Sequence, residues 1–170
     1  MRLNLPHSNH RGPDPVVTPE GVYTWEPFST QHQMLTVVLA VKKIVERLLS
    51  DRFVLAACEV TFKALPLRKT LTDVWNDPDV WFSFNSLNHP FAFGTTLQGT
   101  KEISIGNFPF IFPDAPGVVA ATMIHEMAHV AGAPRDTDEA ERTLLKCGFG
   151  DYFSPEIIGM VRRGSRRLFA

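Results

Sequence analysis

The stretch His125-Glu126-Met127-Ala128-His129 places two histidines four positions apart, with a glutamate directly after the first. In an α-helix four residues turn about 400°, so both imidazoles leave one face roughly 6 Å apart along the axis. That separation allows both rings to bind one zinc ion, and Glu126 lies about 100° round the helix, within reach of a zinc-bound water. The stretch therefore predicts a one-zinc hydrolase site, with His125 and His129 as ligands and Glu126 as general base.

The flanking residues predict a helix from about Pro116 to Ala131. Residues 117–124 carry no charge, and Asp114 suits the position before the first helical turn. Gly132 and then Pro134 are typical of a helix end. An ordinary helix with two surface histidines is the alternative. The apolar run argues against it, because an unpaired imidazole is costly in an apolar environment.

A catalytic zinc ion usually takes three protein ligands and keeps a fourth position for water. Arg135 stands where the third histidine of an HExxHxxGxxH motif would fall, and a cation cannot bind zinc. Three acids remain, and the spacing favours Asp138 first, then Glu141, then Asp136. Helix capping is the alternative for all three. Asp136 with Glu139, and Asp138 with Glu141, have the spacing of a capping box, and acids at a helix start also suit the dipole.

Residues 100–141 resemble the aspzincin, or deuterolysin-type, metallopeptidases. In that family a strand and an aromatic-rich loop, here residues 101–113, precede the metal-binding helix. An aspartate ligand then follows HExxH after a short turn that contains glycine. The resemblance implies a zincin-like fold, hydrolysis of peptide bonds and Asp138 as the third ligand, with the motif residues in the roles given above.

Two positions depart from the family pattern. Asp136-Thr137 stands where the family usually has Gly-Thr, and Glu141 replaces a tyrosine that stabilises the oxyanion. The candidate replacement donors are Tyr152, Arg135, His89 and Tyr23. A zincin-scaffold binding protein with little or no catalysis is therefore an alternative function. A zinc amidase acting on cell-wall peptides is another, because the same motif serves both chemistries.

Short strands are predicted over residues 80–84, 91–97 and 101–105, the last two joined as a hairpin through residues 98–100. Zincin-type enzymes bind the substrate backbone along an exposed strand edge near the metal helix. The candidate edge strand consists of Ile103, Ser104, Ile105 and Gly106, where the glycine would let a ligand backbone approach closely. A plain sheet strand with a turn glycine is the alternative.

Further helices are predicted elsewhere in the chain. Residues 30–49 carry apolar side chains at helical spacing, whereas residues 53–62 fit either a continued helix or a strand. Ser154-Pro155-Glu156 opens a final helix that ends near Gly164. Basic residues follow that either complement the helix dipole or bind an acidic partner: Arg162, Arg163, Arg166 and Arg167.

The length of 170 residues suits one compact domain, with 44% apolar and 21% charged residues. We expect an α+β, zincin-like single domain over residues 26–170, mostly helical with a small antiparallel sheet or hairpin beside the metal-binding helix. Residues 1–25 are rich in proline, histidine and asparagine and predict a flexible or draped arm. Cys58 and Cys147 form either one bridge or two buried thiols.

The charge and hydropathy of the chain limit the classes of partner and the cellular location that we expect. A net charge of -1 gives no case for nucleic acid or an anionic membrane, and no apolar run is long enough for a membrane span. A protein or peptide substrate is the expected partner. The N-terminus lacks the apolar region of a signal peptide. We therefore expect a cytoplasmic enzyme, or a toxin or effector exported by a specialised secretion system.

Overall fold

The computed structural model describes residues 1–18, 21–86, 93–97, 99–135 and 137–152. The α-helices are α1 (Gln31–Ser50), α2 (Arg52–Ala64), α3 (Leu71–Asn76), α4 (Ala115–Val130) and α5 (Glu139–Lys146). The strands are β1 (Arg2–Leu3), β2 (Val16–Thr18), β3 (Gly21–Tyr23), β4 (Trp81–Phe84), β5 (Gly94–Thr96) and β6 (Glu102–Ile105). Short 3-10 helices are η1 (Phe108–Ile111) and η2 (Gly150–Tyr152). The fold is mixed α/β with helices predominating, as expected.

Among the described residues the main sheet has four strands, in the order β1-β4-β6-β5. The expected hairpin is confirmed, since β5 pairs antiparallel with β6 and places Thr96 opposite Ile103. The expectation of an antiparallel sheet is wrong for the rest, because β1 with β4 and β4 with β6 are parallel. Strand β6 lies between β5 and β4. It is antiparallel to β5 and parallel to β4.

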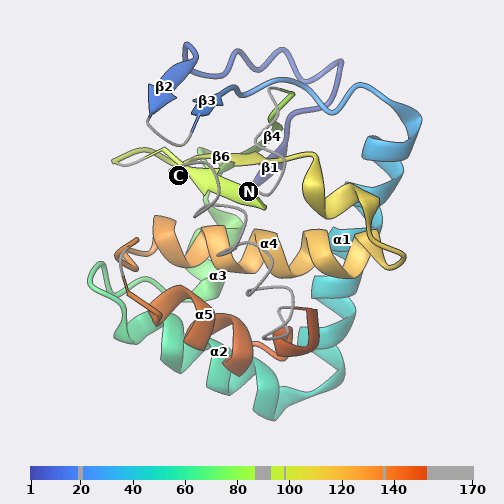
Figure 1. Ribbon diagram of the computed structural model, residues 1–170. Helices are drawn as coiled ribbons and strands as arrows, with labels where there is room; N and C mark the ends of the chain where they lie inside the picture. Colours follow the sequence, from blue (N-terminus) through green and yellow to red (C-terminus); the bar gives the residue numbers. More distant parts are fainter. Residues whose placement is uncertain (19–20, 87–92, 98, 136, 153–170) are drawn as a thin grey trace, which may run out of the picture.

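The N-terminal residues lie draped over this sheet. β1 adds to its edge beside β4, while β2 and β3 form a separate antiparallel pair on the side of the sheet opposite α4 (Figure 1). The His10 ring stacks on Trp81 at 3.9 Å, and the Ser104 hydroxyl donates to the Thr24 carbonyl at 2.6 Å. These contacts tie the segment to β4 and β6 from one face.

Helix α4 crosses the molecule between the sheet and the pair α2 and α5 (Figure 1). Nearly all of its residues are buried, as its uncharged sequence requires. The Asp114 side chain accepts from the Gly117 N–H at its start, and the helix ends at Val130. The predicted helix from Pro116 to Ala131 is therefore confirmed to within one residue at each end.

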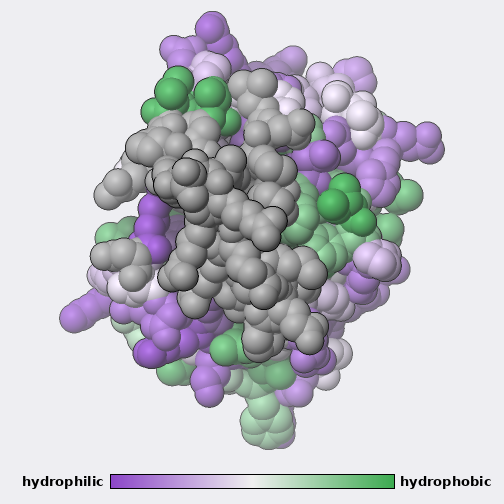
Figure 2. Space-filling model, in the orientation of Figure 1, coloured by the Kyte–Doolittle hydropathy of each residue, from purple (hydrophilic) through white to green (hydrophobic). Residues whose placement is uncertain are grey.

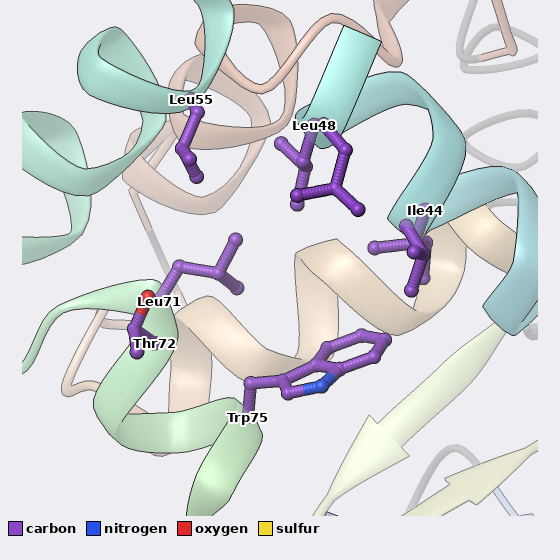
Figure 3. A pocket seen from close by; sticks show the side chains of 8 residues that line it. Ile44, Leu48, Leu55, Leu71, Thr72 and Trp75 are labelled. Carbon is purple, nitrogen blue, oxygen red and sulfur yellow. The ribbon is translucent and has the colours of Figure 1, made fainter. Parts of the chain in front are cut away.

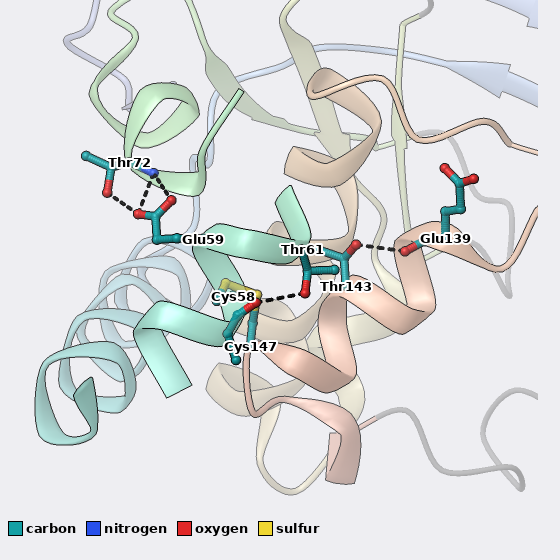
Figure 4. The surroundings of a disulfide bond; sticks show 8 residues. Cys58, Glu59, Thr61, Thr72, Glu139, Thr143 and Cys147 are labelled. Atoms are coloured by element: carbon teal, nitrogen blue, oxygen red, sulfur yellow. Dashed lines mark hydrogen bonds between the residues drawn. A yellow bond between two sulfur atoms is a disulfide. The ribbon is translucent and has the colours of Figure 1, made fainter. Parts of the chain in front are cut away.

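The other helices pack around α4. Thr30 and Gln33 form a capping box at the start of α1, which covers the predicted helix. The ambiguous stretch 53–62 is helical and forms most of α2, whose first turn is capped by the Asp51 carboxylate. Cys58 of α2 and Cys147, the residue after α5, form a disulfide bond (Figure 4). The bridge joins two cysteines that are 89 residues apart in the chain.

The described surface mixes polar and apolar side chains. In Figure 2 the hydrophobic areas of the face shown lie among hydrophilic ones. An apolar cavity of about 280 Å³ lies between α1, α2 and α3, with Leu48, Leu71 and Trp75 in its wall (Figure 3). None of the motif residues lines it, so it is separate from the candidate site. Within the described residues, no helix combines the length and the apolar character that a membrane crossing requires.

Candidate metal centre

The two motif histidines face each other on the last turns of α4. Their Nε2 atoms lie 3.2 Å apart, and both side chains are half-buried. Two zinc–nitrogen bonds of about 2.0–2.1 Å at a tetrahedral angle would separate the nitrogens by about 3.3–3.4 Å. The observed spacing therefore matches two ligands of one ion. His125 and His129 therefore have the predicted orientation on one face of the helix.

The backbone after α4 orients His129. Its Nδ1 lies 2.7 Å from the Ala133 carbonyl oxygen, which can only accept, so Nδ1 carries the proton. The Nε2 atom then carries the lone pair and faces His125 Nε2 at 3.2 Å, as in many metal sites where a carbonyl fixes the tautomer. Gly132 makes the turn with a φ of 103°, and a Cβ there would lie 3.0 Å from the Leu67 nitrogen. A glycine is therefore required.

Burial favours the neutral form of His125. Desolvation lowers its pKa from the ordinary value, the charge of Glu126 opposes this effect, and His129 adds to it. A neutral imidazole is the form that binds metal. The environment of α4 therefore holds this side chain in its ligand form over a wider range of pH than an exposed histidine.

Glu126 lies between α4 and β5. Its side chain is 4% exposed, and the Thr96 hydroxyl lies 2.8 Å from Oε2 and 3.1 Å from the Glu126 carbonyl oxygen. A Cβ on Gly94 would lie 2.9 Å from the Thr122 side chain and 3.1 Å from Glu126 Oε1. Strand β5 thus approaches the helix closely, and Oε1 faces the strand. The roles of Thr96 and Gly94 were missed in the sequence, because nothing local pairs residues 30 positions apart.

The structure separates the candidate third ligands. Asp138, the preferred one, is 62% exposed and pairs with Arg142 at 2.9 Å. Glu141 instead has a buried Oε2 without a hydrogen-bond partner. A buried carboxylate oxygen needs a donor or a cation, so Glu141 fits a metal better than Asp138 does. Across the described part of the chain, however, no third acid, histidine or cysteine gathers with the two histidines. Asp136 lies outside the described residues.

The prediction that residues 103–106 form an exposed edge strand is wrong. Ile103, Ser104 and Ile105 belong to β6, which lies between β4 and β5 and is paired on both sides. Both isoleucines are fully buried. The strand beside α4 that ends the described sheet is β5, because the hairpin turns outward from β6. Gly106 also pairs inward, since its N–H donates to the Phe93 carbonyl.

Two candidate oxyanion donors lie away from the motif. The Tyr152 ring packs against Gly117 in the first turn of α4, about 12 Å along the axis from His125. Tyr23 lies in β3, across the sheet from α4 (Figure 1). The structure therefore brings neither tyrosine to the histidines. His89 and the C-terminal arginine cluster, with its helix, lie outside the described residues.

Arg135 is the remaining donor, and it shares a cavity with His129. This cavity of about 340 Å³ lies between the loop after α2, the β5–β6 turn and the turn after α4. Its lining includes Thr96, Pro134 and Leu67. His129 therefore lines a cavity that carries one permanent positive charge in its described wall.

Comparisons with protein-family models, with curated proteins and with solved structures found no match. The aspzincin resemblance therefore stays a prediction that rests on the residues of the motif and its flanks. The geometry of His125, Glu126 and His129 is independent of that resemblance, because it follows from α4 and its packing.

Proposed function

We propose that this chain is a zinc-dependent metallopeptidase with a zincin-like site, in which His125 and His129 bind one zinc ion and Glu126 is the general base. Glu141 is the candidate third ligand, although in the described structure it does not gather with the two histidines. The observation that carries the proposal is the pair of Nε2 atoms facing each other at 3.2 Å, next to a buried glutamate. Glu141 replaces Asp138 as the preferred acid because its buried Oε2 has no other partner in the described residues.

The residues of the chain supply the proton transfers. A bound zinc ion would contribute Lewis-acid activation of water and of the substrate carbonyl. Glu126 accepts the proton of the attacking water and passes it to the leaving amine. The Thr96 hydroxyl holds Oε2, which leaves Oε1 for this transfer. Burial favours the neutral form of His125, and the Ala133 carbonyl orients His129.

The outer edge of β5 supports binding of an extended peptide. Phe93 and Leu97 direct backbone groups at β6, so the alternate residues Gly94 and Thr96 direct theirs away from the sheet. A substrate backbone can pair with the Gly94 groups and the Thr96 N–H by strand addition beside Glu126, whereas the Thr96 carbonyl already accepts from Arg135. The same edge lies along α4 from Thr122 towards His129, so an added strand would lie beside the proposed site.

Zinc content measured by elemental analysis after dialysis tests the ligand set. We expect one zinc per wild-type chain and loss of zinc in His129→Ala and Glu141→Gln. Asp138→Asn is the matched control and should keep its zinc. Retention of zinc by Glu141→Gln with loss in Asp138→Asn would return the third position to Asp138, and retention by His129→Ala would end the proposal.

Peptide cleavage followed by mass spectrometry tests the chemistry. Glu126→Gln should keep zinc and fold while turnover falls by about 10²–10⁴-fold, the usual contribution of a general base. Unchanged turnover would remove Glu126 from the mechanism. Zinc binding without cleavage of any peptide would favour the binding-protein alternative, and cleavage confined to cell-wall peptides would favour the amidase.

A further inference from the structure

The cavity beside His129 has one permanently charged side chain in its described lining, which is Arg135. The other described walls are apolar or neutral and include Pro66, Leu67 and Pro134. A guanidinium group stays protonated at any physiological pH. A group that enters this cavity therefore meets a lining of apolar residues and of polar ones such as Thr96, Thr100 and His129, with one fixed cation, and that cation favours an anion over a positive group.

The Arg135 guanidinium is held in place by contacts with β5. Its Nη2 donates to the Thr96 carbonyl oxygen and lies 3.4 Å from the Thr95 hydroxyl. Among the described residues no carboxylate pairs with it. A guanidinium has five N–H donors in a planar fork, and the contacts with β5 use only Nη2. Both bidentate edges of a guanidinium include Nη2, so its second hydrogen, together with Nη1 or Nε, can bind both oxygens of a carboxylate.

The contact with Thr96 also places this charge relative to the reaction. The Thr96 carbonyl is one of the groups that β5 directs outward, and the Thr96 side chain binds the general base Glu126. A peptide that is paired along this edge would pass Glu126 and then reach Arg135 on the His129 side. The side chain or terminus of the peptide that faces Arg135 would therefore lie close to the bond that is cleaved.

We propose that Arg135 is a specificity-determining residue that binds a carboxylate of the substrate at the Thr96 end of β5. The preferred substrates are peptides with an acid adjacent to the scissile bond, either a terminal carboxylate or an aspartate or glutamate side chain. This inference rests on the proposed peptidase function. It replaces the role of Arg135 as an oxyanion donor.

Binding measured without turnover tests the inference separately from the peptidase function. The zinc-loaded Glu126→Gln protein is titrated by NMR, with the arginine Nε–H resonances as reporters. One probe pair is N-acetyl-trialanine with a free carboxylate and the same peptide as its amide. The other pair is N-acetyl-Ala-Asp-Ala amide and its asparagine counterpart. We expect the acid of at least one pair to bind roughly tenfold more tightly, as hydrogen bonds to a charged group allow.

Variants of Arg135 decide the source of that preference. Arg135→Ala should abolish it, Arg135→Lys should keep part of it, and Arg52→Ala, which removes a charge outside the cavity, should leave it unchanged. A preference that survives Arg135→Ala would mean that the acid binds elsewhere, including on the zinc, and would overturn the inference. Tighter binding of all four probes by Arg135→Ala would overturn it too, because the arginine would then only cap the strand edge.

Cleavage kinetics give a second readout where peptidase activity is present. Arg135→Ala should raise KM for the acidic peptide and leave kcat for the amide peptide unchanged. An equal fall in kcat for both peptides would assign Arg135 to the oxyanion and overturn the inference. Absence of cleavage with the carboxylate preference intact would contradict the peptidase function alone.

Discussion

Removal of the bridge between Cys58 and Cys147 should destabilise the protein strongly. Both residues are fully buried, and the bridge ties the end of α5 to α2 (Figure 4). We consider the double variant Cys58→Ala and Cys147→Ala, because alanine leaves no unpaired polar group in the core. The variant should keep the packing of the helices in the folded state. Its unfolded chain, however, is no longer closed into a loop between the two positions.

The size of the effect follows from the loop of 89 residues. Closing it removes roughly 15 cal/mol/K of entropy from the unfolded chain, which is about 4.6 kcal/mol at 25 °C in the chain-entropy account. For a chain of 170 residues the unfolding entropy is about 360 cal/mol/K near 60 °C, so the Tm should fall by about 13 °C. Helix α5 carries Glu141, so zinc affinity should fall as well.

Thermal unfolding followed by circular dichroism measures this shift on the zinc-free protein. Wild-type protein in a reducing agent should unfold near the temperature of the double variant, and the variant itself should not respond to the agent. A Tm shift below about 3 °C, under one quarter of the shift expected from loop entropy, would refute the reasoning. It would show that the two thiols pack in the core without bridging.

Three further variants test the contacts around the site and the sheet. Thr96→Val should lower kcat roughly tenfold with zinc content unchanged, because Glu126 loses a hydrogen bond to its charged group; an unchanged kcat would show that the hydroxyl does not hold the base. Gly94→Ala should impair peptide cleavage more than thermal stability, since its Cβ would press on Glu126 and the Thr122 side chain; full activity in a cleavage assay would contradict this close approach. Burial raises the pKa of Glu102, so the folded state binds a proton more tightly than the unfolded chain. The free energy of unfolding should then fall as pH rises above about 4.5, and Glu102→Gln should flatten that slope in urea titrations; an unchanged slope would show that another group is responsible.

Local features of the sequence were sufficient for several elements. The bounds of α4 followed from an uncharged run between Asp114 and Gly132, and the histidine spacing followed from helix geometry. The β5–β6 hairpin followed from two short strands and a tight turn. The stretch 53–62 could not be assigned, because its apolar residues fit a helix or a strand, and packing against α5 made it helical.

Other features depend on residues that are distant in the chain. The strand order made β6 central and β5 the edge, and α4 packed so that Tyr152 meets its start rather than its end. The preferred third ligand also changed from Asp138 to Glu141, because Asp138 is exposed whereas Glu141 has a buried carboxylate oxygen. None of these choices can be read from the spacing of neighbouring residues.

The motif alone determined that two imidazoles share one helical face with a carboxylate beside them, because a helix sets the directions of side chains within one or two turns. Only the tertiary structure decided which strand lies over that helix, which hydroxyl holds the carboxylate and where Arg135 stands. These arrangements arise when the sheet and the helices bury their apolar faces together, and that packing joins residues 30 or more positions apart.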